Sequence, residues 1–480
     1  MNRRISMPPQ RLLMATLLLS LAGCASLTKG EGAEPGTTQG AVAATAARDI
    51  PGHWWRDWQD PELDALVART LAHNGEIRIA AARLREAQAR RDEVDASRYP
   101  ALGLLASSAR AGQPLGGGTH SSHRVGLVAS HEIDLWGRIA AQRSTAAHDA
   151  QAQAWAVAMV QWSLVAQVVE VHVDLMAVNA KLTAAGEVRA TVSGLVDILQ
   201  AGNQAGTHAP LDLERAMADL AATDSTIASL HRLRLALLMR RALLAGEGDA
   251  DLVAAPPTGM DDSLARLASA PLPRGALEHT LQRRPDVQEA LASLAGRDAA
   301  WLATRRARWP QVFLSGDLGS DAARVSGLFS AGGMFWSLAQ GLAFSLFDSG
   351  AADARTGQAQ ARQEAAQARY EHTMVRALLE VREAYAAMDV NRSVRDAQQR
   401  RVAALDKAVD MARTGYDAGA LAQIDLLDAQ RQRLIARMAL VDSQRDLVVG
   451  QVAAFKALGA GHDGIGRTPL QGAPQHGERS

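Results

Sequence analysis

The chain has 480 residues, with 51 basic and 51 acidic side chains and one cysteine. The balanced charge gives no reason to expect a nucleic-acid partner. The single cysteine excludes an internal disulfide and a multi-cysteine metal site. The sequence contains no phosphate-binding Gly-rich loop with Lys-Ser/Thr, no Gly-x-Ser-x-Gly elbow and no His-Glu-x-x-His pair, so no enzyme, no catalytic residue and no cofactor is expected.

The first residues predict export. Three arginines within the first eleven residues precede an apolar run over 12–19, and small residues follow up to Cys24. A charged segment, a short apolar segment and small residues are typical of a signal peptide, here 1–23, and not of a membrane span. Residues 24–50 are rich in Gly, Ala, Thr and Pro and predict a flexible tether.

Cys24 ends the sequence Leu-Ala-Gly-Cys, which resembles the lipobox of bacterial lipoproteins. In that motif the thiol is diacylglycerated and the cysteine becomes the new N-terminus, so the resemblance implies a covalent lipid on Cys24. Ala25 follows it, and in lipoproteins a residue other than aspartate at this place favours the outer membrane. The alternative is a buried free thiol, but a core cysteine has no reason to follow an apolar export segment.

A tryptophan cluster and a helix start come next. Trp54, Trp55 and Trp58 have two open placements: the membrane interface, where indole is favoured, or packing against the rest of the chain. Asp60 followed by Pro61 predicts a helix N-terminus, because aspartate caps helices and proline fits their first position.

Two strands are then predicted over 99–110 and 124–135, with a loop rich in Gly, Ser and His over 112–122. In the second strand the odd-numbered residues from 125 to 135 are apolar except His131. Such alternation fits one lipid-facing and one polar face. A second strand pair, predicted over 309–320 and 335–347, alternates less regularly.

Long helices follow each strand pair, over about 138–200 and 351–413. Apolar residues spaced by three and four along both segments predict coiled-coil seams. Helices of about 60 residues are roughly 90 Å long, three times a bilayer core. Antiparallel returns are predicted over about 210–245 and 421–458. No run of 18 apolar residues follows the signal peptide, so no transmembrane helix is expected.

The chain repeats itself at an offset of about 210 residues. Three pairs of segments carry the repeat: Tyr99-Pro100 with Trp309-Pro310, Leu135-Trp136-Gly137 with Leu346-Phe347-Asp348, and Leu211-Asp212-Leu213 with Ile424-Asp425-Leu426. A duplication of this length predicts one interleaved, pseudo-symmetric architecture. If such a chain spans a membrane it must do so as a barrel, and four strands cannot close around water, so several chains must contribute.

The motifs in this order resemble the TolC-like outer-membrane efflux proteins, in particular their lipoprotein branch, often called NodT-like. The resemblance covers nearly the whole mature chain. The motifs that carry it are the lipobox, Trp54-Trp55 through Asp60-Pro61-Glu62-Leu63, Tyr99-Pro100, Glu132-Ile133-Asp134-Leu135-Trp136-Gly137-Arg138, Arg284-Pro285-Asp286-Val287, Trp309-Pro310, Leu346-Phe347-Asp348-Ser349-Gly350 and Gly415-Tyr416-Asp417-Ala418-Gly419.

The resemblance implies a mainly α fold with a membrane β-barrel part: a duplicated strand-helix repeat whose homotrimer forms a 12-stranded barrel that continues into a long α-helical coiled-coil tunnel. It implies the exit duct of a tripartite efflux or secretion system for drugs or other small toxic molecules. The implied location is the outer membrane, with a lipid anchor and the tunnel in the periplasm. Outer-membrane lipid, a periplasmic adaptor and an inner-membrane pump are the implied partners, and in this family the pump and adaptor largely choose the substrate.

The resemblance also divides the chain into domains. The expected domains are the signal peptide 1–23, the lipidated tether 24–50, a first efflux repeat over 51–245 with its β-hairpin at 99–135, a connector over 246–273, a second repeat over 274–458 with its β-hairpin at 309–347, and a flexible tail over 459–480.

Asp425 and Asp428 are the candidate constriction residues. They lie three apart, on one helix face, in a segment that resembles the periplasmic tip of the TolC-like tunnel. Three copies would gather six carboxylates, which favour cations. The alternative is a pair of ordinary solvated helix charges, with Asp425 favoured near a helix N-terminus. Tyr416 matches a tyrosine that helps lock the closed tip in this family, but Leu421 stands where the family's clamp arginine is expected.

Three histidines raise the question of a metal site. His120, His123 and His131 are the candidates, but two ring nitrogens in a loop are few for a site that usually needs three or four ligands. An ordinary extracellular loop is therefore expected, with no metal.

Two other kinds of protein remain alternatives. A periplasmic adaptor is also a lipoprotein with coiled-coil hairpins, but the duplicated strand-helix order argues against it. A structural lipoprotein that bridges the layers of the envelope would need no barrel strands.

Overall fold

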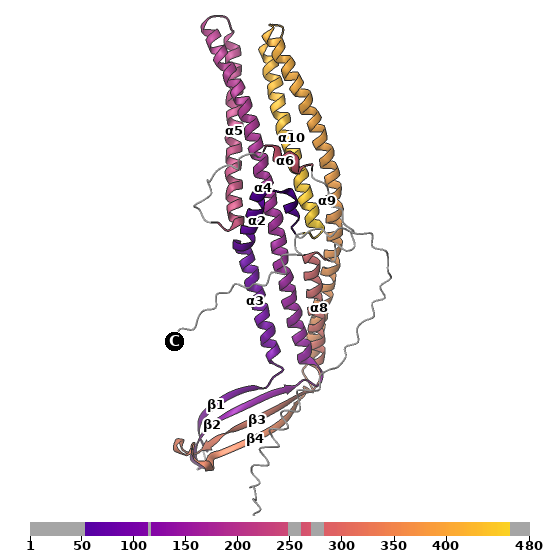
Figure 1. Ribbon diagram of the computed structural model, residues 1–480. Helices are drawn as coiled ribbons and strands as arrows, with labels where there is room; N and C mark the ends of the chain where they lie inside the picture. Colours follow the sequence, from indigo (N-terminus) through magenta and orange to yellow (C-terminus); the bar gives the residue numbers. More distant parts are fainter. Residues whose placement is uncertain (1–52, 114–116, 248–260, 270–282, 461–480) are drawn as a thin grey trace, which may run out of the picture. The chain divides into compact units, whose positions relative to one another are not determined.

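The computed structural model describes four stretches of the chain, all within one unit, Arg48–Ser480 (Figure 1): residues 53–113, 117–247, 261–269 and 283–460. The predicted signal peptide, Cys24 and the tether lie outside the described residues. So do most of the predicted connector and all but the first two residues of the predicted tail.

The first half follows the predicted order of elements. It consists of a 3-10 helix η2 (Trp54–Trp58), helices α2 (Pro61–His73) and α3 (Gly75–Ala96), strands β1 (Ala101–Gln113) and β2 (Gly117–Ile133), and helices α4 (Arg138–Gln204) and α5 (Pro210–Ala245). The predicted helix that starts at Pro61 is divided at Asn74 into α2 and α3. Asp60 caps α2 as predicted, since its Oδ1 accepts the backbone N–H groups of Glu62 and Leu63, both at 3.0 Å.

The second half repeats this order after the short helix α6 (Asp261–Leu267). It consists of α8 (Pro285–Arg306), β3 (Gln311–Ala322), two 3-10 turns η3 (Val325–Gly327) and η4 (Ala331–Gly333), β4 (Met334–Ala343), α9 (Ala351–Asp417) and α10 (Gln423–Ala457). α4 and α9 each contain 67 residues, about 100 Å of helix. Two strand-helix halves with four strands in total confirm the predicted repeat.

The strands form one antiparallel sheet in the order β1-β2-β3-β4. The prediction of a loop over 112–122 is wrong for most of these residues. β1 extends to Gln113, and β2 already begins at Gly117. Pairing of Ala111 with His120 and of Gly112 with Thr119 continues the ladder into this polar segment, since backbone hydrogen bonds need no apolar side chains.

One face of the sheet is apolar across all four strands. The register places Leu104, Leu127, Leu318 and Trp336 in one row, and all four side chains are exposed. Successive side chains of a strand alternate between the two faces. The remaining residues of the strands therefore lie on the opposite face, and this face carries the polar groups. The register therefore aligns the apolar residues of β3 and β4 with those of β1 and β2, although Phe313 and Phe335 lie on the polar face.

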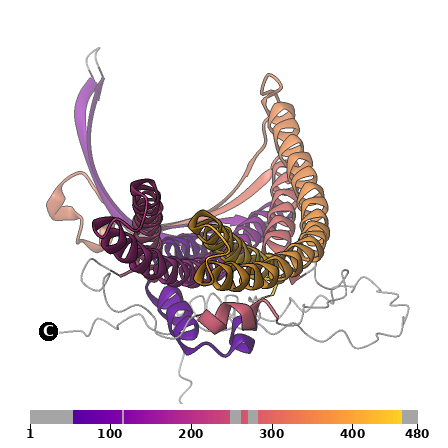
Figure 2. The same cartoon turned by 90° about the horizontal axis from the view of Figure 1, so that it is seen from above.

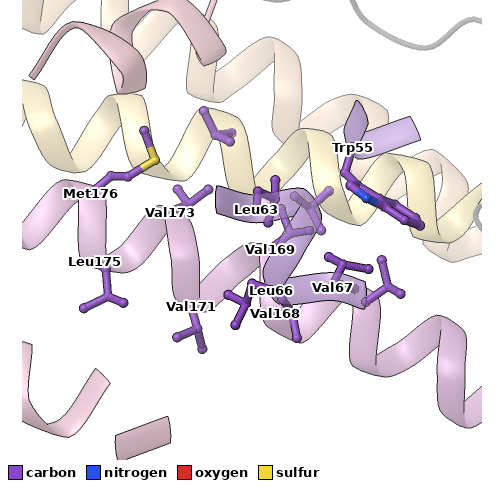
Figure 3. Packing of buried hydrophobic residues seen from close by; sticks show 14 of the residues in the cluster. Trp55, Leu63, Leu66, Val67, Val168, Val169, Val171, Val173, Leu175 and Met176 are labelled. Carbon is purple, nitrogen blue, oxygen red and sulfur yellow. The ribbon is translucent and has the colours of Figure 1, made fainter. Parts of the chain in front are cut away.

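The long helices differ in how much of their surface is covered. α4 packs against α2, α3, α5, α6, α8 and α10, whereas α9 packs mainly on α8 and α10. The predicted α4 seam is buried at its centre, from Leu164 to Val178. α2 and α6 lie on the same side of the long helices (Figure 2), and Leu63 and Leu66 of α2 join Val168 and Val169 of α4 in the main core (Figure 3).

The tryptophan cluster belongs to this core. Trp54, Trp55 and Trp58 are all buried, and the Trp54 ring stacks on Phe455 of α10 with ring centroids 4.5 Å apart. Of the two placements left open by the sequence, packing against the helices is the one observed. These side chains fix η2 and α2 to the long helices.

Among the described residues, one helix is long and apolar enough by composition to cross a membrane. It is α4, with a window of 18 residues at a mean hydropathy of 1.4. More than half of that window, 56%, is buried inside the structure, as in the central helix of a soluble bundle.

Candidate functional site

The two helical hairpins turn at glycines with left-handed backbone. Gly206 ends the α4 side of the first turn at φ 71°, and Gly419 ends the α9 side of the second at φ 70°. Only glycine adopts this conformation without strain. Both turns lie at the end of the helices away from the sheet (Figure 1), so the segment with the candidate aspartates lies at the hairpin tip.

Asp425 and Asp428 lie on one exposed face of the first turns of α10, while Leu426 and Leu427 between them are buried. The Asp425 carboxylate accepts the backbone N–H of Ala422 at 3.2 Å, and Asp428 pairs with Arg431 at 2.5 Å. Within one chain both aspartates thus have the local partners of solvated helix charges. Their shared exposed face also leaves them available to other copies of the chain.

The second hairpin turn is tightened by close packing. A Cβ at Gly415 would lie 2.6 Å from Cδ1 of Leu421, so the leucine found in place of the family's arginine occupies the space beside this glycine. In the first turn the ring of His208 lies against Gly202 in the same way. Tyr416, beside Gly415, is half-buried, and its role as a tip lock stays a prediction.

Three ion pairs join α4 to α10 along the stretch that runs from the core toward the tips. They are Lys181 with Asp442 at 2.5 Å, Asp174 with Arg445 at 2.7 Å, and Glu187 with Arg437 at 2.9 Å. The sequence analysis did not predict these pairs. The available signal was that Asp174 and Lys181 are one heptad apart and so lie on the same face of α4. Each pair is partly exposed, so each contributes about 0.5 kcal/mol or less, but together they fix the register of the two hairpins.

In each half, the residue before one helix is tied to the end of a returning helix, and we call these two contacts the joints. The first joint ties the start of α3 to the end of α5, and the second ties the start of α8 to the end of α10. In the first joint the Asn74 amide donates to the carbonyl of Leu244 at 2.9 Å, and its Oδ1 caps α3. In the second joint Arg284, only 1% exposed, donates to the carbonyl of Ala457 at 3.0 Å. Asn74 and Arg284 are repeat partners, and so are Leu244 and Ala457.

Arg284 also makes a charged network. Its guanidinium binds both carboxylate oxygens of Asp286, at 3.0 and 2.8 Å, and Glu380 at 2.5 Å. It lies 5.4 Å from the ring centroid of Trp162. Burial opposes the charge, but the hydrogen bonds to Asp286 and Glu380 outweigh it and raise the pKa of Arg284. The arginine therefore stays charged in the core beside a cavity of about 630 Å³.

A second buried polar pair ties α2 to α4. His172, 1% exposed, lies 2.8 Å from Asp60 through its Nε2. The hydrogen bond from His172, with those from Leu63 and Glu62, lowers the pKa of Asp60 from 3.8 to about 2 although burial acts in the opposite direction. Asp60 is thus both a helix cap and the partner of a buried histidine.

The polar face of the sheet carries its own charges. Arg124 of β2 is paired with Asp321 of β3 in the register, and its guanidinium lies 4.3 Å from the ring centroid of Phe335. Asp317 accepts a hydrogen bond from the Ser337 hydroxyl at 2.9 Å. This face suits contact with water, and the apolar face suits contact with lipid.

The histidines do not come together. All three lie in β2, with His120 on one face and His123 and His131 on the other, and His123 and His131 are about 26 Å apart along the strand. His123 is paired with the Ser108 hydroxyl at 2.9 Å. Among the described residues, no group of three or more His, Cys, Asp or Glu side chains is arranged to hold a metal ion.

Comparison with known families identifies the same repeat. The family described as outer membrane efflux protein matches residues 66–244 and 276–460, so one match covers most of each half. The matched segments together span more than half of the chain.

Curated relatives match over nearly their whole length. The cation efflux system protein CusC of Escherichia coli strain K12 is 27% identical over 463 residues, covering 95% of this chain and 100% of CusC. The probable outer membrane lipoprotein SilC of Salmonella typhimurium is 25% identical, covering 94% of this chain and 98% of SilC. The solved structure of the outer-membrane channel OprN superposes with a TM-score of 0.79 at 29% identity, covering 90% of this chain and 99% of OprN.

Proposed function

As a member of the outer membrane efflux protein family, this chain is the outer-membrane channel of a tripartite efflux system and not an enzyme, and we propose that three copies assemble into the conducting unit. In this assembly twelve strands close a barrel in the outer membrane. The long helices continue from the barrel as a tunnel into the periplasm. The two efflux repeats would then be the segments 51–245 and 274–458, joined by the connector.

The four-stranded sheet is the observation that carries this proposal. Its apolar face crosses all four strands, yet β1 and β4 each pair on one side only within the described residues. In lipid, an unpaired edge leaves N–H and C=O groups without hydrogen bonds at a cost of several kcal/mol each. Pairing of β4 with β1 of a neighbouring copy removes both edges.

The helices support the same assembly. α9, at one edge of the helical layer, exposes Val375, Leu379, Val390 and Val394. α5, in the other half, exposes Leu211, Leu233, Met239 and Leu243. Apolar stripes of this length on two separate helices suit contact between neighbouring copies, since each copy can then cover one stripe with the other.

We place the lipid anchor on Cys24 and the chain in the outer membrane. The lipobox-like sequence supports this, as does similarity over the full length to SilC, which is described as a probable outer membrane lipoprotein. Two elements would then hold the trimer in the membrane, the acyl chains and the barrel.

Asp425 and Asp428 are the proposed constriction of the tunnel, and Tyr416 a residue that helps to hold it closed. Three copies bring six carboxylates from the exposed face of α10 to the axis, which would favour cations at the narrowest point. Arg431 already neutralises part of the charge of Asp428. Opening would therefore involve this ion pair as well as Leu421.

A periplasmic adaptor and an inner-membrane pump are the proposed partners. Relatives of similar identity are named for different cargo: CusC for cation efflux, and OpmQ of Pseudomonas putida for pyoverdine export. Two relatives about equally similar to this chain but named for such different cargo support a substrate choice made by the pump and adaptor. The adaptor and structural-lipoprotein alternatives lose support, because neither needs an amphipathic sheet.

Planar-bilayer conductance of the purified protein tests the proposal. We expect discrete cation-selective channels whose selectivity falls in the Asp425→Asn/Asp428→Asn variant. Asp389→Asn, an exposed aspartate in the middle of α9, is the control and should leave selectivity unchanged. Equal cation selectivity in wild type, the double variant and the control would mean that the constriction lies elsewhere in the tunnel. A protein that stays monomeric in detergent would contradict the proposed assembly.

A further inference from the structure

A pocket of about 730 Å³ lies where α8 ends and β3 begins. Three arginines line it, Arg305, Arg306 and Arg308, together with the aromatic side chains of Trp136, Trp309 and Phe344. None of the described residues that line it is acidic. We call it the arginine pocket.

The arginines are held in place but only partly neutralised. Arg306 donates to the carbonyl of Gly137 at 2.9 Å, and Arg308 pairs with Asp353, outside the pocket lining, at 2.9 Å. Arg305 lies over the Trp301 ring at 4.8 Å, and no carboxylate among the described residues pairs with it. The pocket therefore carries net positive charge that suits an anion.

The helix end does not by itself explain these arginines. The C-terminus of a helix favours positive side chains in its last turn. In the first half, however, α3 has the same length as α8 and ends without a basic residue in its last turn. In α3, the residues that correspond to Arg305 and Arg306 in the repeat are Asp95 and Ala96. The same backbone thus tolerates an acidic end, and the cluster is specific to the second half.

The pocket continues into the apolar face of the sheet. Phe344 and Pro310 have even numbers, as do Trp336 of β4 and Leu318 of β3 in the apolar row. By strand alternation they continue the same face of the sheet. Trp136 stacks on Trp309 with ring centroids 5.2 Å apart and donates its indole N–H to the carbonyl of Pro310 at 2.8 Å. Tryptophan with one apolar and one hydrogen-bonded side is favoured at the boundary between lipid tails and headgroups.

We propose that the arginine pocket binds the phosphate-containing headgroup of an anionic phospholipid in the periplasmic leaflet of the outer membrane. This inference rests on the proposed function, which puts the strands in the membrane and the helices in the periplasm. The acyl chains lie against the apolar face of the sheet, and the headgroup phosphate meets the guanidinium groups of Arg305 and Arg308. Basic pockets at a membrane boundary recognise anionic headgroups in this way.

Native mass spectrometry of the purified full-length protein tests the site. The protein in a neutral detergent is mixed with phosphatidylglycerol or with phosphatidylcholine, and non-covalent lipid adducts are counted. We expect retention of phosphatidylglycerol over phosphatidylcholine by about tenfold, falling to about twofold or less in the Arg305→Gln/Arg308→Gln variant. Arg98→Gln, the first-half partner of Arg308, should keep the wild-type preference.

Three results would overturn the site: equal retention of the two lipids by wild type, an unchanged preference in the double variant, or an adduct of inorganic phosphate under conditions in which phosphatidylglycerol gives none. The last would assign the pocket to free phosphate instead of a lipid. The same spectra report the number of chains per particle. A trimer without lipid preference therefore contradicts the pocket alone, whereas a monomer with lipid preference contradicts the proposed assembly.

Discussion

At matched positions about 210 residues apart, the first half of the chain places Asn74, Asp95 and Arg215, whereas the second half places Arg284, Arg305 and Asp428. The backbone around each pair is the same. Both halves have a 22-residue helix before the strands and a 67-residue helix after them. The duplication therefore fixes the scaffold, while the charge carried on it differs between the halves at the joint, at the end of the 22-residue helix and at the tip.

Four glycine positions stay alike because the backbone there leaves no choice. Gly206 and Gly419 turn the hairpins, and Gly246 and Gly459 end the returning helices, all four with φ near 70°. A side chain at any of them would be strained. Identity at these strained positions, beside the different charges at the three pairs above, is the pattern expected when each half must fold to the same shape but takes a different place in the assembly.

The largest expected effect comes from the joints. Arg284→Met removes the buried partner of Asp286 and leaves the carbonyl of Ala457 unpaired, which should destabilise the protein by about 3–5 kcal/mol. Asn74→Ala loses a neutral hydrogen bond and a helix cap, at about 1–3 kcal/mol. The urea midpoint of the helical circular dichroism signal measures the loss of stability in both variants. Equal losses would mean that the charged joint and the neutral joint contribute equally to stability.

A smaller effect is expected at the glycines that end the returning helices. A Cβ at Gly246 would lie 2.5 Å from the backbone carbonyl oxygen of His73, whereas a Cβ at Gly459 would lie 3.2 Å from Cγ of Arg284. The backbone cannot move aside as a flexible side chain can. Gly246→Ala should therefore cost about 3 kcal/mol and Gly459→Ala about 1–2 kcal/mol, both including the strain of positive φ.

The same urea titration measures the two glycine variants. The reverse order, with Gly459→Ala the more costly, would show that Arg284 is held too firmly by Asp286 and Glu380 to yield. In that case the charged joint is the more rigid of the two.

Local signals in the sequence predicted much of this fold. The repeat, the cap at Asp60 and the seams of the long helices all depend on residues close in the chain, and the structure confirms them. The hairpin length was wrong because cross-strand pairing carries β2 back to Gly117 through residues without apolar alternation. The Arg284 network and the arginine pocket could not be predicted, because their members come together from segments far apart in the chain: Arg284 and Ala457 are 173 residues apart, and Trp136 and Pro310 are 174 residues apart.

At the tips, the comparison can be tested by making the first half resemble the second. Arg215→Asp places a carboxylate three residues after Asp212, the arrangement found at Asp425 and Asp428. Arg215 is exposed and should tolerate the change within about 0.5 kcal/mol. If the first tip also faces the conducting path, the change turns three positive charges into three negative ones in each trimer.

Cation selectivity in planar bilayers should then rise, and more so at 0.1 M than at 1 M salt, because the screening length falls from about 10 Å to about 3 Å. A rise independent of salt would indicate a change in the shape of the tip and not in its charge. Unchanged selectivity at both concentrations would place Arg215 away from the path. The aspartate pair of the second half would then act because of where α10 stands in the assembly, and the three-residue spacing alone would not be enough to make a constriction.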